Sequence, residues 1–339
     1  MQKASLSEFG MSTQRIIVGA EQAEQTVAAL LRSILPGRSW SEVRRLVATR
    51  RVKIGGDLCL DPARRVHEGE VFEFLARPAA PPRHREMITV RHLDEHLVVV
   101  EKPSGVSTVR HPSERDWNAQ RKALSPTLED LVPPLIARTE GRLRKGPLPR
   151  LRVVQRLDKE TSGLVVFARS VVAERGLGKQ FHAHTVTRRY LAAVPGYVAP
   201  RRIETRLVRD RGDGRRGSTE WPDQGKPAVT HVEVAERLPG YTVLACRLET
   251  GRTHQIRIHL AELGHPVCGE KVYNRRPDGT AQPASRGAPR LALHAAELGF
   301  IHLATGKGMQ WTMPLPPDLQ GFLDRLRGGK KKAAQSDAD

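Results

Sequence analysis

The chain has 339 residues, of which 56 are Lys or Arg and 37 are Asp or Glu, so its formal net charge is +19. This surplus favours a polyanionic partner, because binding releases the counterions condensed on a phosphate backbone; a solvated basic surface and a surface that binds anionic lipid are the alternatives. Three scattered cysteines without a CxxC motif argue against a disulfide framework, and no long apolar run or signal-peptide core predicts membrane insertion or export, so we expect a cytoplasmic protein without membrane contact.

A small domain is expected over residues 15–77. Ser39 and Glu42 have the spacing of a capping box, which opens a helix whose arginines would mostly face outward. The Pro-rich residues 78–87 then predict a linker. The elements expected within the small domain are two helices over residues 26–35 and 41–51, a hairpin over residues 52–60 and a strand over residues 66–74.

A larger domain is expected over residues 88–326. Its predicted strands outnumber its helices and do not alternate strictly with them, so we expect an α+β fold with a mixed, largely antiparallel sheet. The strands are expected over residues 96–105, 163–170, 188–198, 230–238 and 241–249, and the helices over residues 171–184 and 252–264. Loose loops or insertions are expected over residues 108–150, 209–217 and 275–289, and a disordered basic tail over residues 327–339.

The small domain resembles a known RNA-binding module. Its two helices, a basic stretch, V-x-I-x-G, a hairpin and the strand H-E-G-E-V-F are similar to the S-four domain shared by a small-subunit ribosomal protein, tyrosyl-tRNA synthetases and many RNA-modifying enzymes. The resemblance implies that the second helix and the following loop contact phosphates of structured RNA. Without it, a solvated helix face is the alternative. The implied RNA-binding residues are Arg38, Arg44, Arg45, Arg50, Arg51 and Lys53.

Residues 153–168, VVQRLDKETSGLVVFA, place Arg156 and Asp158 in a turn ahead of a buried strand. Taken alone, such an Asp is more often a turn residue paired with the arginine. The segment resembles the signature H-R-L-D-x-x-T-S-G of the large-subunit-ribosomal-RNA-type (Rlu-type) pseudouridine synthases. Their catalytic domain is thereby implied over about residues 88–317. Further segments resemble the family in the same order: VVVEKPSGV at 98–106, RRYLAAVPG at 188–196, residues 249–273, and RLALHA at 290–295.

The resemblance implies an enzyme that detaches uracil from its ribose, turns it and rejoins it through carbon. Because nothing enters or leaves, no metal, cofactor or second substrate is implied. Asp158 would be the catalytic carboxylate, as nucleophile or base, and whether it attacks the sugar, the base or a ribose proton stays open. Arg257 would pair with Asp158 and keep it charged. Tyr190 would lie against the uracil, and Arg156 would fill the gap left by the flipped uridine.

Two positions depart from the family pattern: Gln155 stands where His is usual, and Arg188 stands where Lys is common. Both keep hydrogen-bonding capacity or charge, so the departures bear on the target RNA rather than on activity. His254 and His259 are spaced i, i+5 but lack an HExxH motif or a carboxylate partner in the sequence. We therefore expect structural or phosphate-facing roles for them rather than a metal site.

Large-subunit ribosomal RNA is the expected substrate, because an appended S-four domain accompanies the ribosomal-RNA members of this family more often than the tRNA members. A tRNA or dual-specificity synthase is the alternative within the class. A non-catalytic RNA-binding protein of ribosome assembly is the alternative from another class, and the intact set of four site residues argues against it. A monomer is expected by default.

Overall fold

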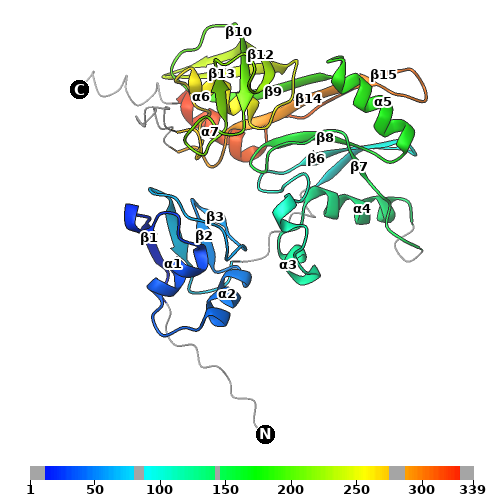
Figure 1. The fold of residues 1–339 in the computed structure, drawn as a ribbon. Helices are drawn as coiled ribbons and strands as arrows, with labels where there is room; N and C mark the ends of the chain where they lie inside the picture. The colour runs from blue at the N-terminus through cyan, green and yellow to red at the C-terminus, as the bar shows by residue number, and fades with distance from the viewer. Residues whose placement is uncertain (1–11, 80–87, 142–145, 275–286, 329–339) are drawn as a thin grey trace. The chain divides into compact units, whose positions relative to one another are not determined.

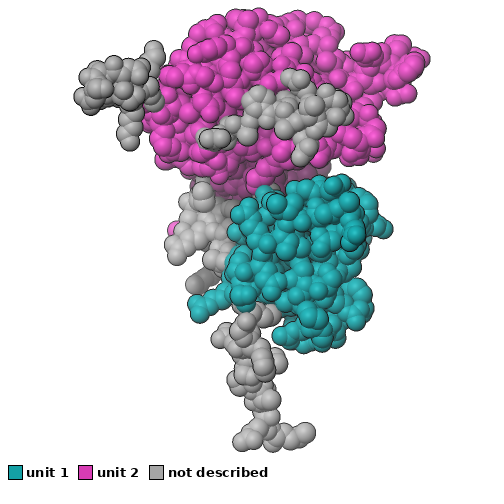
Figure 2. Space-filling view, turned by 90° about the vertical axis from the view of Figure 1, so that its left-hand side faces the viewer, with its two compact units in different colours: residues 1–83, 111–126 teal, residues 84–110, 127–339 magenta. Residues whose placement is uncertain are grey.

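The computed structural model describes residues 12–79, 88–141, 146–274 and 287–328. The chain forms two compact units, one of residues 1–83 and 111–126 and one of residues 84–110 and 127–339, called here the first and the second unit (Figure 2). The sequence did not indicate that residues 111–126 would belong with the first unit. Parts of the expected linker, of the expected loop over 275–289 and of the expected tail lie outside the described residues: 80–87, 275–286 and 329–339.

The described part of the first unit has a four-stranded antiparallel sheet, three α-helices and two short 3-10 helices. Ser39 caps α2 (Trp40–Ala48), because its hydroxyl accepts the N–H of Glu42 at 3.3 Å while the Glu42 carboxylate accepts the N–H of Ser39 at 2.9 Å; the predicted capping box is confirmed. The strand order is β1 (Gln14–Ile17), β4 (Val71–Phe74), β2 (Val52–Ile54) and β3 (Asp57–Leu58), and the remaining elements are η1 (Ala20–Gln22), α1 (Val27–Ile34), α2 (Trp40–Ala48), η3 (Pro112–Glu114) and α3 (Ala119–Leu124).

The second unit is built on an eleven-stranded sheet that is antiparallel except where β8 (Ser162–Ala168) pairs with β14 (Leu293–Ile301) (Figure 1). The mixed, largely antiparallel sheet expected from the sequence is therefore confirmed. The main path runs β11 (Gly217–Thr219), β10 (Arg201–Val208), β12 (Lys226–Leu238), β13 (Tyr241–Leu248), β9 (Thr187–Pro195), β14 (Leu293–Ile301), β8 (Ser162–Ala168), β6 (Leu97–Lys102) and β5 (Thr89–Leu93), with β15 (Gly308–Thr312) on β14 and β7 (Arg152–Val153) on β8.

Helices cover both faces of this sheet at β6 and β8 (Figure 1). Successive side chains of a strand point to opposite faces. Val98 of β6 and Val165 of β8 therefore lie in one core with α4 (Leu128–Thr139), α6 (Gln255–Glu262) and α7 (Pro317–Gly328), whereas their neighbours pack under α5 (Val171–His182). Burial on both faces explains why both strands are continuous apolar runs. None of the helices within the described ranges is long and apolar enough to cross a membrane.

The expectation of loose structure over residues 108–150 is wrong for its central part. Helix α4 begins at a capping box of Thr127 and Asp130 and buries one apolar face. Pro133 and Pro134 lie inside this helix. Two adjacent prolines ordinarily indicate a break, because each removes a backbone donor. Here the buried face and the cap outweigh that loss.

Candidate active site

The loop that carries Asp158 lies just before β8 and is held by the segment that follows β6. The Thr108 hydroxyl donates to the carbonyl of Leu157 at 2.8 Å and accepts the N–H of the same residue at 3.0 Å. The Ser104 hydroxyl donates to the carbonyl of Glu160 at 2.7 Å. Within the loop, the N–H of Thr161 donates to the carbonyl of Asp158 at 3.1 Å. The backbone on both sides of Asp158 is thus fixed by hydrogen bonds.

Lys102, at the end of β6, joins the same two segments from the interior. Its ammonium is fully buried and donates to the carbonyls of Pro103, Val106 and Lys159 at 2.9, 2.6 and 3.0 Å. Burial lowers the pKa of Lys102 to about 7, whereas three carbonyl acceptors match the three N–H donors of an ammonium and favour the charged form. Lys102 therefore acts as a cross-link between residues 103–106 and the Asp158 loop.

Gly163 lies where β8 passes close to β14. Its φ is +125°, and a Cβ there would overlap the carbonyl oxygen of Ala295, so only glycine fits. Ala295 in turn is opposite Tyr190 on β9. The strand that follows Asp158 and the strand that carries Tyr190 are therefore separated only by β14.

Tyr190 is 6% exposed and lies beneath the site. Burial raises the pKa of Tyr190, Arg188 opposes that rise, Asp158 adds to it, and a side-chain hydrogen bond with Gln155 lowers it. The phenol therefore keeps its proton at neutral pH. Gln155, the departure from the family's usual His, thus contacts the expected uracil-facing tyrosine.

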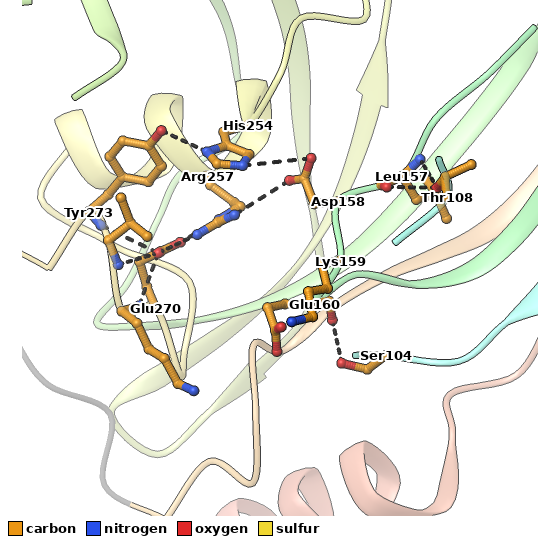
Figure 3. A network of polar contacts seen from close by, with 12 residues as sticks. Ser104, Thr108, Leu157, Asp158, Lys159, Glu160, His254, Arg257, Glu270 and Tyr273 are labelled. Atoms are coloured by element: carbon orange, nitrogen blue, oxygen red, sulfur yellow. Dashed lines mark hydrogen bonds and ion pairs between the residues drawn. The ribbon is translucent and has the colours of Figure 1, made fainter. Parts of the chain in front are cut away.

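The guanidinium of Arg257, on α6, contacts two carboxylates, those of Glu270 and Asp158 (Figure 3). Its Nε and Nη2 donate to Glu270 at 2.7 and 2.6 Å, and its Nη1 lies 3.6 Å from Oδ2 of Asp158. The Glu270 side chain is 1% exposed and also accepts backbone N–H groups of residues 271–273. Burial alone would raise the pKa of Glu270, but hydrogen bonds from Arg257 outweigh it and lower that pKa. The bidentate pair holds one guanidinium N–H toward Asp158.

His254 lies on the other side of the Asp158 carboxylate. Its Nε2 is 3.9 Å from Oδ1 of Asp158, and its Nδ1 is 2.8 Å from the hydroxyl of Tyr273. The residue precedes α6 in a left-handed conformation, with φ 60°. Burial lowers the pKa of His254 and raises the pKa of Tyr273 to about 12. At neutral pH both groups are therefore uncharged.

The structure brings together the expected Asp158, Arg257 and Tyr190, while Arg156, two residues before Asp158, is exposed. Glu270, Tyr273 and Lys102 were not given roles from the sequence. Glu270 lies in the matched segment 249–273, but Asp158 was already the expected carboxylate partner of Arg257, so nothing in the sequence pointed to a second one.

His259 is buried between two threonine hydroxyls, those of Thr205 and Thr230 at 3.0 and 2.9 Å. Burial lowers the pKa of His259 to about 4, so the ring is neutral and links α6 to the sheet. Across the described parts of the chain, no group of three or more His, Cys, Asp or Glu is placed to hold a metal ion.

The basic residues expected to bind RNA occupy different environments in the first unit. Arg44 and Arg45 are exposed on α2, Lys53 is half-buried on β2, and Arg38 pairs with Glu42 at 3.1 Å.

Arg51 is half-buried and donates to the carbonyl of Ala76 at 2.5 Å. Arg50 is 8% exposed and donates to the carbonyls of Ala79 and Leu124. The expected outward orientation is therefore wrong for Arg50, because its guanidinium satisfies carbonyls inside its own unit.

The sequence model of a family described as RNA pseudouridylate synthase matches residues 96–262. Over 239 residues the chain is 38% identical to "Ribosomal large subunit pseudouridine synthase D" of Nitrosomonas europaea, which covers 69% of this chain and 64% of that protein. Over 323 residues it is 33% identical to the protein of the same name from Zymomonas mobilis, and this match covers 93% of this chain and 98% of that protein. The solved structure "Human RNA Pseudouridylate Synthase Domain Containing 4" is similar in fold, with TM-score 0.54 and 23% identity over 70% of this chain and 92% of that one.

Proposed function

Because this chain belongs to the RNA pseudouridylate synthase family, we propose that it isomerises uridines of large-subunit ribosomal RNA to pseudouridine, with Asp158 as the reacting carboxylate. The observation that carries the proposal is the position of Asp158. Its side chain is 22% exposed and stands beside the buried Arg257, whose other two donor nitrogens are occupied by Glu270. The choice of ribosomal RNA is supported by the names of the relatives from Nitrosomonas europaea and Zymomonas mobilis.

In the proposed reaction the Asp158 carboxylate acts as nucleophile or base while the bond between ribose and uracil breaks. Arg257 stabilises the negative charge of that carboxylate from a buried position, where electrostatic interactions are stronger than in water. Tyr190 contacts the uracil as it turns, and its protonated hydroxyl is available for hydrogen bonding. Arg156 is exposed next to the site and occupies the gap that the flipped uridine leaves in the RNA stack.

Two alternatives differ from this proposal in substrate or in chemistry. A tRNA or dual-specificity synthase would use the same residues on another RNA. A non-catalytic RNA-binding protein of ribosome assembly would have no use for a carboxylate held between Arg257 and His254. The geometry therefore favours an enzyme over a binding protein.

Tritium release tests the function directly, because forming the new carbon–carbon bond at uracil carbon 5 displaces the hydrogen there. The substrates are large-subunit ribosomal RNA, assembling large-subunit particles and bulk tRNA, each labelled at that carbon. We expect release from the ribosomal RNA or its particles and none from tRNA. Release from tRNA alone would show that tRNA is the substrate. Tight binding without release from any of the three would favour a non-catalytic RNA-binding protein of ribosome assembly.

We also propose that the exposed face of α2 in the first unit contacts RNA phosphates. Arg44→Ala and Arg45→Ala should each weaken RNA binding several-fold at about physiological salt, whatever the RNA sequence. The slope of log K against log salt should become shallower by roughly 0.7 to 0.9 for each lost phosphate contact. Titration of labelled RNA at several salt concentrations measures both quantities.

Arg15→Ala is the matched control, because Arg15 carries the same charge on β1 of the same unit with its side chain 69% exposed. An unchanged salt slope is expected for it. Equal effects of all three substitutions would instead indicate a general dependence on net charge.

A further inference from the structure

His254 stands between the proposed catalytic carboxylate and a buried phenol (Figure 3). Its Nδ1 lies 2.8 Å from the hydroxyl of Tyr273, a hydrogen-bond distance, and its Nε2 faces Oδ1 of Asp158 at 3.9 Å. Tyr273 is 2% exposed. The two rings meet edge to face, with centroids 5.6 Å apart and planes at 78°.

The surroundings select one tautomer of the neutral ring. A neutral imidazole has one N–H donor and one acceptor nitrogen. If Nδ1 carried the hydrogen, the lone pair of Nε2 would face the negative oxygen of Asp158, which is repulsive. If the Tyr273 hydroxyl donates to Nδ1 instead, the N–H of Nε2 points at Asp158. The second arrangement satisfies both contacts, so the hydrogen bonds run from Tyr273 through His254 toward the carboxylate.

The charged groups around His254 come from four segments of the second unit. Burial is the largest influence and lowers the pKa of His254, the two carboxylates raise it, and the two guanidinium groups lower it. At neutral pH the ring is therefore uncharged, as the tautomer argument requires. The groups are Asp158 before β8, Arg257 on α6, Glu270 after α6 and Arg216 before β11.

The backbone around His254 fixes where its ring can lie. A left-handed conformation is unfavourable for a residue with a Cβ, so neighbouring contacts must enforce it. The next residue, Gln255, is 2% exposed, and its side chain donates to the carbonyl of Val229 and contacts the hydroxyls of Thr230 and Thr250. These contacts hold the first turn of α6 against β12 and aim the His254 ring at Asp158.

We propose that His254 and Tyr273 are positioning residues for the reaction: Tyr273 selects the tautomer of His254, and His254 holds Oδ1 of Asp158 while Arg257 holds Oδ2. This inference rests on the proposed function. The separations of 3.9 and 3.6 Å exceed hydrogen-bond length. Catalytic hydrogen bonds often close only in the complex with substrate. The carboxylate is then held from both sides when the uridine enters.

Tyr273→Phe is the first test, because it removes only the hydroxyl. Without that donor only the charge of Asp158 favours the hydrogen on Nε2, so the His254 ring also samples the tautomer that does not support Asp158. We expect kcat for tritium release to fall about tenfold and KM for RNA to stay unchanged, because neither residue is assigned an RNA contact. Tyr197→Phe is the control, since Tyr197 is 63% exposed on another loop of the second unit, and it should leave both constants as in the wild type.

His254→Gln and His254→Asn form a matched pair for the second test. Asn tolerates the left-handed backbone, but its amide is too short to replace Nε2, so kcat should fall about 100-fold. The longer Gln amide can still donate to Asp158, and we expect it to recover part of that loss. A role limited to packing gives no such ranking.

The pH profile separates positioning from packing. Below its lowered pKa, His254 in the wild type gains a proton, Nδ1 stops accepting from Tyr273, and the imidazolium pairs with Asp158 and weakens its reactivity. Wild-type kcat should therefore fall as the pH drops through this lowered pKa, which lies on the acidic side of an ordinary histidine. His254→Gln has no titrating ring, so its kcat should remain flat across that range.

If Tyr273→Phe and His254→Asn have the same kcat, KM and pH profile as the wild type, the positioning role is wrong, whereas the proposed function still stands. A change in KM alone would overturn it equally. If the wild type releases no tritium from any RNA, the proposed function fails first and the inference fails with it. Thermal unfolding by circular dichroism identifies variants that do not fold, and Tyr273→Phe, which keeps the ring, carries the test if His254→Asn is among them.

Discussion

Asp158→Asn should abolish tritium release, with kcat reduced on the order of 10³-fold or more, the scale on which catalytic acids, bases and nucleophiles act. The amide has the shape of the carboxylate but neither its charge nor its reactive lone pairs. Arg257 keeps its bidentate pair with Glu270 in this variant, so no buried charge loses its partner. RNA affinity and the unfolding temperature should therefore remain close to those of the wild type.

Asp223→Asn is the control for this result, because Asp223 is exposed on a loop of the second unit and the chemical change is identical. Wild-type activity is expected for it. Single-turnover kinetics with saturating enzyme would separate the chemical step from RNA binding. A residual rate near that of the wild type in Asp158→Asn would remove this residue from the reaction and leave Glu270, the other carboxylate on Arg257, as the group to test.

Glu270→Ala should give the largest loss of stability among the site variants, roughly 3–5 kcal/mol in the free energy of unfolding. The substitution leaves the Arg257 guanidinium buried with two donors unmatched, and it removes the acceptor of the backbone N–H groups at 271–273. For a unit of this size the unfolding temperature should fall by about 10 °C. Activity should fall as well, because Arg257 is no longer held toward Asp158.

Glu297→Ala is the matched comparison. Glu297 pairs with Arg189 at 2.6 Å, but the two side chains are 21% and 41% exposed, so breaking this pair should cost about 0–1 kcal/mol. The double variant Arg257→Met/Glu270→Leu should regain much of the lost stability, because apolar side chains can replace a buried ion pair, while remaining inactive. Equal losses of unfolding free energy from Glu270→Ala and Glu297→Ala would contradict the expectation that a buried ion pair costs more to break than a partly exposed one.

The local elements were predictable where short-range patterns decide them. The capping box of Ser39 and Glu42 begins α2 as expected, and apolar runs predicted β6 and β8. Helix α4 was missed because Pro133 and Pro134 suggest a break, whereas its stability comes from packing on strands distant in the sequence. Tertiary burial of this kind has no local signature.

Within the site, the family resemblance led to Asp158, Arg257 and Tyr190, which the structure places near one another. The residues around them depend on the fold. Glu270 accepts two hydrogen bonds from Arg257 because of the way the chain turns after α6. No spacing rule predicts this contact. The expectation for Arg50 was wrong for a similar reason. As a charged residue in a basic run it was expected to face solvent, but its side chain is buried and donates hydrogen bonds to backbone carbonyls.

The place of β14 in the sheet has a consequence for synthesis of the protein. This strand, residues 293–301, lies between β8, which follows Asp158, and β9, which carries Tyr190, while α6 with Arg257 packs on β12 in the β9 half. A nascent chain that ends before Leu293 lacks the strand that joins the two halves of the sheet. The site is therefore completed only after β14 has left the ribosome, later than β8, β9 and α6, and such long-range strand insertion is slow compared with local folding.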